Sequence, residues 1–407
     1  MKSAIDIDRR RLLASSGAAV IAAGAGALSN ASAQTPAPVT PAAVQAKPLP
    51  PYVAWKDANS LIVHTPTTIE TKRAAFGTGV VTPVNQLFIR NNLPAPDASI
   101  VADRDAWKVS IEGVRTPRTL TVADLRALGL ETVTAVLQCS GNGRSFFPSK
   151  PSGTKWAVGA AGCVIWSGVP VKAVVDALGG VSGGMTYMTG TGGEALPAGI
   201  DPNSIIVERS VPIEAMESAL LAWELNGEPM PLAHGGPLRL IVPGYSGVNN
   251  IKYVKRLAFT AAQTDAAIQK TGYRMSPPGQ KGDPSQPSIW EMGVKSWINA
   301  PSDAAPVKAG WVQLHGVAMG GTQAARRVEV SVDGGKTWRD AAFIGPDLGR
   351  YAWRQFVMPV RLAPGTYTIM SRATDSQGRV QPESSPDNGG GYLNSGWLAH
   401  GVRVVVA

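Results

Sequence analysis

The sequence has little cysteine and little histidine, and both shortages narrow the chemistry open to it. Only Cys139 and Cys163 occur among 407 residues, so they could form one disulfide but not a disulfide framework. No Cys-x-x-Cys-His motif is present, and we therefore expect no haem on this chain. The four histidines lie far apart without ligand spacing, which argues against a zinc site.

Charged residues make up only 16% of the chain, and no long basic run occurs beyond the first residues. The net charge of +9 is spread over 38 Lys and Arg, which favours a solvated surface with an anion pocket over nucleic-acid binding. Glycine and proline are abundant, at 45 and 32 residues, and 44% of the residues are hydrophobic. This composition and length predict a turn-rich protein of two or three domains dominated by strands.

Residues 1–33 have the parts of a secretory signal: a basic head, an Ala/Gly-rich apolar stretch and the small-residue site Ala31-Ser32-Ala33. The Arg9-Arg10 pair is typical of a twin-arginine signal, which exports folded, cofactor-loaded proteins. An uncleaved membrane anchor over residues 12–28 is the alternative, although this stretch is weakly hydrophobic. No other segment could cross a bilayer, so we expect a soluble periplasmic protein with no membrane span after cleavage.

The rest of the chain divides into four parts by composition and hydrophobic period. Residues 34–84 begin with a Pro/Ala-rich run and are predicted to form an extended N-terminal arm. Residues 85–265 mix strands with short helices, one of which begins at the capping box of Thr121 and Asp124. Residues 266–292 are a Pro/Gly-rich linker, and residues 293–407 alternate strands and turns. The predicted fold class is α+β, a mixed α/β domain followed by an immunoglobulin-like β-sandwich.

Cys139 lies in "LQCSGNGRSFF", directly after a strand-like apolar run. A cysteine in such a place is often a buried small hydrophobe. Gly141 and Gly143 let the backbone approach another group closely, and Arg144 brings a charge that favours a thiolate. A nucleophile would need a base, and no histidine occurs in a recognisable context for one. A buried thiol and a thiolate ligand of a soft metal both remain open.

Five segments occur in the order found in a known family. They are "LFIRNNLPAP", "LQCSGNGRSFF", "TKWAVGAAGCVIWSGVPV", "LLAWELNGEPMPLAHGGPLRLIVPGYSGVNNIKYVKRL" and "VEVSVDGGKTW". Over residues 85–407 the chain resembles the sulfite oxidase family of molybdopterin-dependent oxidoreductases, most of all its bacterial, periplasmic, haem-free sulfite dehydrogenases. The resemblance implies a molybdopterin domain of the sulfite oxidase type over residues 85–265 and a β-sandwich dimerisation domain over residues 293–407.

The resemblance also implies a set of site residues. Cys139 would be the molybdenum ligand, and Arg90 and Arg144 would be two cations that meet a small oxyanion beside the metal. Tyr273 in the linker would handle protons, and Trp156 would wall the pocket. The residues expected to hold the pterin and its phosphate are Phe88, Arg90, Asn91, Asn92, His234, Arg239, Asn250 and Lys252.

Two positions depart from the family pattern. Asn92 stands where animal members carry histidine, which puts proton handling there in question. Gly401 stands where eukaryotic members are expected to carry an arginine over the substrate, and Arg403 points elsewhere along a strand. A third anion-binding charge is therefore in doubt.

The resulting prediction is a periplasmic molybdenum-dependent sulfite dehydrogenase. It would oxidise sulfite to sulfate and pass the electrons singly to an external c-type cytochrome, since no Gly-x-Gly-x-x-Gly follows a strand to hold NAD or flavin. The sandwich domain predicts a homodimer. Three alternatives remain: the molybdenum subunit of a sulfane dehydrogenase in a thiosulfate-oxidising complex, a sulfoxide-type reductase of the same fold, and a protein that only holds the cofactor.

Overall fold

The computed structural model describes residues 47–303 and 305–407, and the predicted signal peptide lies outside these residues. Within the described part no helix is long and apolar enough to cross a membrane. The α-helices are short: α1 (Val122–Arg126), α2 (Val171–Ala177), α3 (Pro202–Ile205) and α4 (Ala267–Lys270). The 3-10 helices are η1 (Pro51–Val53), η2 (Ala58–Ser60), η3 (Arg73–Phe76), η4 (Ala98–Val101), η5 (Arg144–Phe146), η6 (Ile213–Ser218), η7 (Leu232–His234) and η8 (Gly247–Asn249).

The first sheet corrects the predicted extended arm (residues 34–84) over residues 47–84, and the rest of that arm lies outside the described residues. Strands β1 (Leu61–Thr65), β2 (Thr68–Thr71) and β3 (Ile89–Arg90) form an antiparallel three-stranded sheet. The segment "LIVHTPTTIET" is rich in β-branched residues on both sides of a turn, which is the pattern of a hairpin. Leu61 and Ile69 are buried in a small core with Ile89, so this segment is part of the globular protein and presents Arg90 at the end of its last strand.

A second sheet carries the segment around Cys139. Its strand order is β11 (Glu228–Pro229), β10 (Leu220–Leu225), β7 (Ala161–Pro170) and β6 (Glu131–Gln138), and β12 (Arg239–Ile241) also pairs with β10. The β6–β7 ladder runs antiparallel and closes with Gln138 opposite Ala161. Cys139 is therefore the first residue beyond the paired end of β6, as the apolar run before it predicted.

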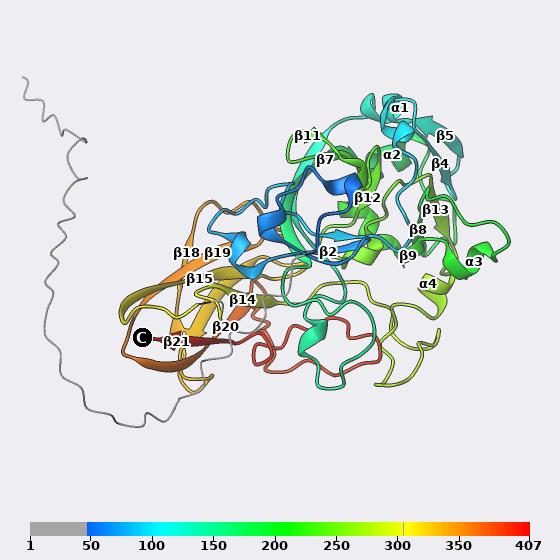
Figure 1. The fold of residues 1–407 in the computed structure, drawn as a ribbon. Coiled ribbons are helices and arrows are strands. Elements are labelled where there is room, and N and C mark those ends of the chain that lie inside the picture. The colour runs from blue at the N-terminus through cyan, green and yellow to red at the C-terminus, as the bar shows by residue number, and fades with distance from the viewer. Residues whose placement is uncertain (1–46, 304) are drawn as a thin grey trace, which may run out of the picture. The chain divides into compact units, whose positions relative to one another are not determined.

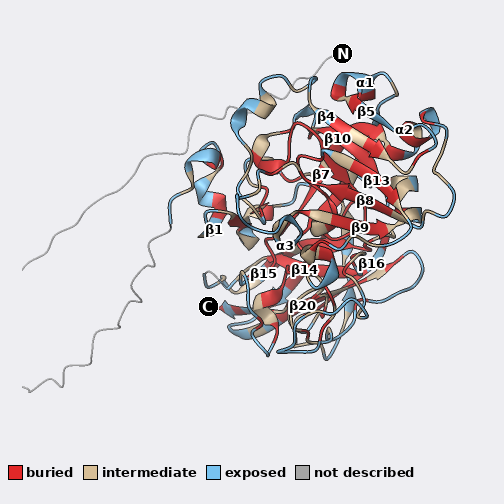
Figure 2. Cartoon of the chain, turned by 90° about the vertical axis from the view of Figure 1, so that its right-hand side faces the viewer, coloured by how far each residue is buried: buried red, intermediate tan, exposed pale blue. Residues whose placement is uncertain are grey.

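A third sheet has the order β5 (Arg118–Thr121), β4 (Lys108–Glu112), β13 (Arg256–Thr260), β8 (Tyr187–Thr191) and β9 (Glu208–Pro212). Thr121 caps α1 in the predicted capping box with Asp124. Apolar side chains of this sheet, of α1 and α2 and of β10 and β12 form one large core. Figure 2 shows that buried residues dominate β7, β8, β10 and β13 in the middle of this domain.

The C-terminal part confirms the predicted β-sandwich (Figure 1). One sheet has the order β14 (Lys295–Ala300), β15 (Gly310–Met319), β19 (Arg354–Leu362) and β18 (Ala342–Ile344). The other has the order β17 (Arg339–Asp340), β16 (Ala325–Ser331), β20 (Gly365–Asp375) and β21 (Val402–Val406). Apolar residues that alternate along these strands meet in a separate core between the sheets.

Candidate active site

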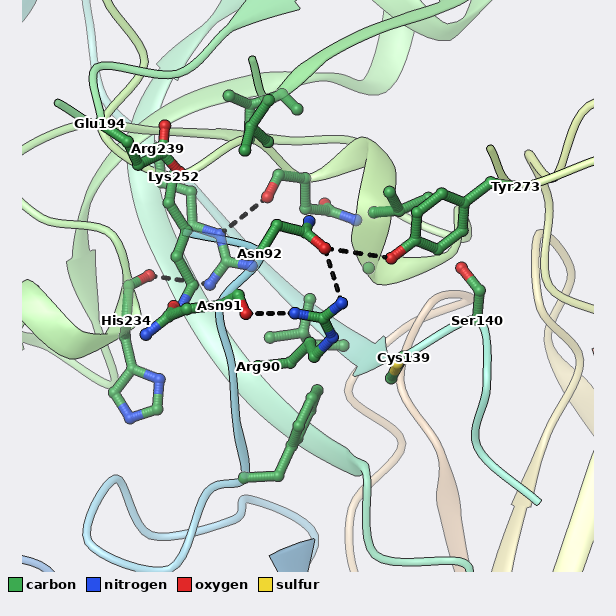
Figure 3. A pocket seen from close by; sticks show the side chains of 17 residues that line it. Arg90, Asn91, Asn92, Cys139, Ser140, Glu194, His234, Arg239, Lys252 and Tyr273 are labelled. Atoms are coloured by element: carbon green, nitrogen blue, oxygen red, sulfur yellow. Dashed lines mark hydrogen bonds between the residues drawn. The ribbon is translucent and has the colours of Figure 1, made fainter. Parts of the chain in front are cut away.

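A cavity in the mixed α/β domain brings together ten of the twelve predicted site residues (Figure 3). They are Phe88, Arg90, Asn91, Asn92, Cys139, His234, Arg239, Asn250, Lys252 and Tyr273. They come from β3, the ends of β6 and β12, the turns at η7 and η8, and the segment after α4. Residues more than 180 positions apart therefore meet in one pocket, which the order of the motifs alone did not show.

Cys139 stands at one end of this pocket in a tightly held loop. Its backbone N–H donates to Ala160 O at 2.8 Å, and its carbonyl accepts from the N–H of Asn142 at 2.9 Å. Gly143 has a φ of 91°, a left-handed conformation that suits glycine. The thiol belongs to a free cysteine and its residue is 7% exposed. The loop thus offers one sulfur to the pocket and keeps its position fixed.

Arg90, Asn92 and Tyr273 form a hydrogen-bonded group close to Cys139 (Figure 3). Arg90 Nη2 donates to Asn92 Oδ1 at 2.6 Å, and the Tyr273 hydroxyl approaches the same oxygen at 3.5 Å. Arg90 Nη1 also donates to the carbonyl of Asn91. Asn92, which departs from the family pattern, is therefore the acceptor that links the arginine to the tyrosine. An oxyanion near Cys139 would meet a guanidinium and a phenol.

The other end of the pocket is strongly basic. Lys252 Nζ donates to Asn91 Oδ1 and to Ala233 O, both at 2.6 Å. Arg239 Nη1 donates to His234 O at 2.8 Å, and its Nε donates to Asn250 O at 3.2 Å. The Lys252 and Arg239 side chains donate only to neutral oxygens here, so their hydrogen bonds leave positive charge available to an anionic ligand.

Burial shifts the pKa values of this basic group. The pKa of Lys252 is held well below its ordinary value, first by burial and then by the nearby Arg239 charge. Burial likewise lowers the pKa of Arg239 to about 10 and that of His234 well below its ordinary value. Burial thus keeps His234 neutral and leaves Lys252 and Arg239 without a full counter-charge, which a bound phosphate would supply.

Several buried polar atoms of the pocket have no hydrogen-bond partner within the described residues. They are Asn91 Nδ2, His234 Nε2 and Ser140 Oγ. Buried polar groups are normally paired, so three unpaired ones in one cavity indicate a ligand with many acceptors and donors. Together with the basic end and the single thiol, they fit a molybdopterin cofactor with an anionic phosphate.

Sequence reasoning missed Glu194, a lining residue that is only 7% exposed. Burial raises the pKa of its carboxyl, while Lys252 and Lys255 oppose that shift. The residue follows β8 in "TGTGGE", where the glycines let the chain turn into the site. A carboxylate just beyond a strand end was the only signal in the sequence, and no family motif marked it.

Arg144 and Trp156 do not line the pocket, which corrects their predicted places. Arg144 Nε donates to Gly390 O at 2.9 Å and its Nη1 to Thr154 O at 3.0 Å. Trp156 is fully buried behind Phe88, and the two ring centroids are 6.5 Å apart in an edge-on contact. Trp156 therefore supports a wall of the pocket from the core and does not form the wall itself.

Gly401 and Arg403, which left a third anion-binding charge in doubt, do not line the pocket. Gly401 packs beside Met370 and Leu398, and Arg403 is exposed on β21. The segment of the sandwich domain that approaches Cys139 is residues 388–394 instead, through the Leu393 N–H that donates to Ser140 O at 2.8 Å.

Cys163 is a free, fully buried thiol on β7, so it packs as a small hydrophobe and forms no disulfide with Cys139. Burial raises the pKa of this thiol to about 12, so it remains protonated and unreactive. Among the described residues no group of three or more His, Cys, Asp or Glu side chains could hold a metal ion. A single thiolate suits a metal that receives its other ligands from an organic cofactor.

Comparisons with known proteins agree with this geometry. The family model described as "Oxidoreductase molybdopterin binding domain" matches residues 94–268, and "Mo-co oxidoreductase dimerisation domain" matches residues 286–406. Sulfite oxidase of Arabidopsis thaliana is 31% identical over 82% of this chain and 90% of its own length. Mitochondrial sulfite oxidase of Macaca fascicularis is 32% identical over 80% of this chain, which spans only 62% of that longer protein.

Among solved structures, the sulfane dehydrogenase SoxCD from Paracoccus pantotrophus superposes with a TM-score of 0.71 at 26% identity. The match covers 85% of this chain and 88% of that one. The predicted mixed α/β domain followed by a dimerisation domain is thus confirmed as a fold. The chain belongs to the sulfite oxidase family and is a molybdopterin-dependent oxidoreductase.

Proposed function

We propose that this protein is a periplasmic sulfite dehydrogenase that converts sulfite and water to sulfate, two protons and two electrons. The electrons would leave singly to an external c-type cytochrome. The observation that carries the proposal is a guanidinium and a phenol, those of Arg90 and Tyr273, held on one amide oxygen beside Cys139. Such a pair is suited to a small oxyanion that presents its sulfur toward Cys139.

The residues of the chain divide between binding and positioning. Lys252, Arg239 and His234 would bind the phosphate of the pterin. Asn91, which lies next to them, would form a hydrogen bond to the cofactor. Cys139 would ligate the molybdenum, and the bound cofactor would supply the two-electron redox chemistry. Arg90 would hold the sulfite oxygens, and Tyr273 would donate a hydrogen bond that stabilises charge on the reacting oxyanion.

Export and assembly rest on other features. The twin-arginine pattern of residues 1–33 supports a periplasmic location, because that pathway carries proteins already loaded with cofactor. The match of residues 286–406 to a dimerisation domain supports a homodimer. An external cytochrome is proposed because the sequence has neither a haem-attachment motif nor a dinucleotide-binding motif.

Steady-state assays of the cofactor-loaded protein test the function. Sulfite should reduce ferricyanide and a c-type cytochrome with stoichiometric formation of sulfate. A protein that contains one molybdenum per chain and yet shows no sulfite-dependent reduction would rule out the proposal. Low molybdenum content after full loading would favour a protein of another class that does not use the metal.

A sulfane dehydrogenase is the second candidate, because SoxCD superposes over 85% of this chain. The two candidates differ in their substrate, which is a sulfur oxyanion in one case and a sulfane sulfur in the other. Parallel assays with sulfite and with a protein-bound or thiosulfate-derived sulfane distinguish them. A higher kcat/KM for the sulfane than for sulfite would favour the sulfane dehydrogenase over the sulfite dehydrogenase.

Tyr273→Phe tests the role of the phenol. The substitution removes the hydroxyl near Asn92 Oδ1 and keeps the ring, so we expect kcat/KM for sulfite to fall about a hundredfold. Tyr367→Phe is the matched control, because that hydroxyl bonds Ala363 O in the sandwich domain, and we expect no change there. An unchanged kcat/KM in Tyr273→Phe, with normal molybdenum content, would show that the phenol takes no part.

A further inference from the structure

The loop that follows Cys139 accepts three hydrogen bonds from the sandwich domain. They are Leu393 N–H to Ser140 O at 2.8 Å, Asn394 Nδ2 to Gly143 O at 3.1 Å and Lys295 Nζ to Asn142 O at 3.2 Å. The first two donors are neutral amides, whereas the third is the ammonium group of Lys295 on β14. The sandwich domain therefore places one charged group against the loop of the proposed metal ligand.

Asn142 connects Lys295 to Cys139 by a short path. The Asn142 N–H donates to the Cys139 carbonyl at 2.9 Å, so the two residues belong to one tight turn. The Asn142 side chain is also fixed, because its Nδ2 donates to Gln138 Oε1 at 3.0 Å and its Oδ1 accepts from the Ala160 N–H at 3.2 Å. Lys295 thus bonds to a rigid part of the loop, three residues from Cys139.

Lys295 is a buried cation without a counter-charge. The residue is 1% exposed, and its ammonium lies 5.7 Å from the Trp297 ring centre. Within residues 47–303 and 305–407 it forms no ion pair with a carboxylate. Burial, followed by the charge of Arg73, lowers the pKa of Lys295 to about 7. Its one hydrogen bond to a neutral carbonyl does not compensate for the loss of water around the charge.

Two other titratable groups interact electrostatically with Lys295, namely Arg73 and His400. Burial, followed by the Lys295 charge, holds the pKa of His400 well below its ordinary value, so this ring is neutral. Arg73 is a second cation, but the carboxylates of Asp303 and Glu70 act on it and oppose the effect of its burial. Lys295 is therefore the charge in this group that no carboxylate balances.

We propose that Lys295 is a positioning residue of the metal site and that its charge raises the reduction potential of molybdenum bound at Cys139. The proposal rests on the proposed function, because it takes Cys139 as the metal ligand. Each one-electron reduction adds one negative charge to the metal, and a buried cation nearby favours the reduced form. A higher potential makes the metal a stronger oxidant of its substrate. The sandwich domain then contributes to the redox chemistry as well as to the proposed dimer.

A redox titration of the cofactor-loaded protein, monitored by electron paramagnetic resonance, measures the potential without turnover. At about pH 6 the lysine is protonated, because this pH is below its pKa. Lys295→Met removes the charge, so we expect the ratio of reduced to oxidised metal at a fixed ambient potential to fall about tenfold, or about 59 mV for a one-electron couple. Lys295→Gln keeps a donor for Asn142 O without the charge and should show the same fall. Lys295→Arg keeps the charge and should keep the wild-type potential.

Lys308→Met is the matched control, because Lys308 is an exposed lysine of the same domain whose charge is screened by water and salt. It should leave the potential unchanged. The free energy of unfolding of the cofactor-free protein gives a second readout. Lys295→Met should be at least as stable as wild type, since the substitution removes an unpaired buried charge and keeps an unbranched side chain.

The proposal is overturned if Lys295→Met and Lys295→Gln keep the wild-type potential, or if Lys308→Met lowers it as much. A wild-type potential in Lys295→Gln alone would assign the effect to the hydrogen bond and would also overturn the proposal. Molybdenum content identifies a variant that does not load, and the other charge-free variant then decides. A large loss of stability in both would show a purely structural lysine. Wild type without molybdenum would refute the proposed function, whereas loaded variants with unchanged potentials refute this inference alone.

Discussion

Cys139→Ser should leave a folded, cofactor-binding protein with less than about one-thousandth of the wild-type sulfite oxidation, a loss of about 4 kcal/mol in transition-state stabilisation. The substitution exchanges a soft thiolate for a hydroxyl that is a poor ligand for molybdenum. The loop should keep its shape, because its hydrogen bonds to Ala160 and Asn142 are made by backbone atoms. Steady-state kinetics together with molybdenum and pterin content measure the two parts of this expectation separately.

Cys163→Ser is the matched control for this thiol-to-hydroxyl exchange. Cys163 is fully buried on β7 and does not line the pocket. A hydroxyl in that apolar place should cost about 1–2 kcal/mol of the free energy of unfolding and leave kcat unchanged. Substantial sulfite oxidation by Cys139→Ser would contradict the assignment of Cys139 as the metal ligand.

The sequence predicted which residues meet in the pocket better than it predicted the fold of the segment that precedes them. Ten residues could be named because short motifs keep their spacing within one strand end or turn, as with Cys139 after β6. The hairpin of β1 and β2 was missed because the Pro/Ala run before it dominated the composition of residues 34–84. Local patterns therefore predicted which residues lie together, and averaging over a long segment caused the error in residues 47–84.

Local sequence patterns could not predict the contacts between the two domains. Arg144 is 246 positions from Gly390 in the sequence, and their hydrogen bond decides where the guanidinium points. Tyr392 lies in a Gly-rich stretch that reads as an ordinary loop, and only the folded chain brings its ring onto Tyr273. Side-chain direction at a domain junction depends on both partners at once, so the sequence could not predict which groups Arg144 contacts.

Lys252→Met should weaken retention of the cofactor about a hundredfold and lower sulfite oxidation in proportion to the cofactor lost. The lysine donates to Asn91 and Ala233 from the basic end of the pocket, where Arg239 adds a second charge. Loss of a charge-assisted hydrogen bond to a phosphate costs about 3 kcal/mol, or about a hundredfold in affinity. Elemental analysis of the purified variant and reconstitution with isolated cofactor measure the loss.

Lys255→Met is the control, because that lysine is three residues away and exposed. It should retain molybdenum and activity at the wild-type level. Normal molybdenum content in Lys252→Met would show that the phosphate is held elsewhere, and the whole orientation of the cofactor in the pocket would have to be reversed.

The pH dependence of the free energy of unfolding of the cofactor-free protein provides an independent test, because the direction of the expected change is known. Because burial lowers the pKa of Lys252 in the folded state, the unfolded chain binds the extra proton at any pH between that lowered pKa and the ordinary value of 10.5. The free energy of unfolding should therefore rise with pH across this window as the penalty for a buried charge disappears. Methionine carries no proton, so this part of the rise should vanish in Lys252→Met. Chemical unfolding of both proteins at several pH values measures the difference, and identical slopes would mean that Lys252 is not buried as a poorly compensated cation before the cofactor binds.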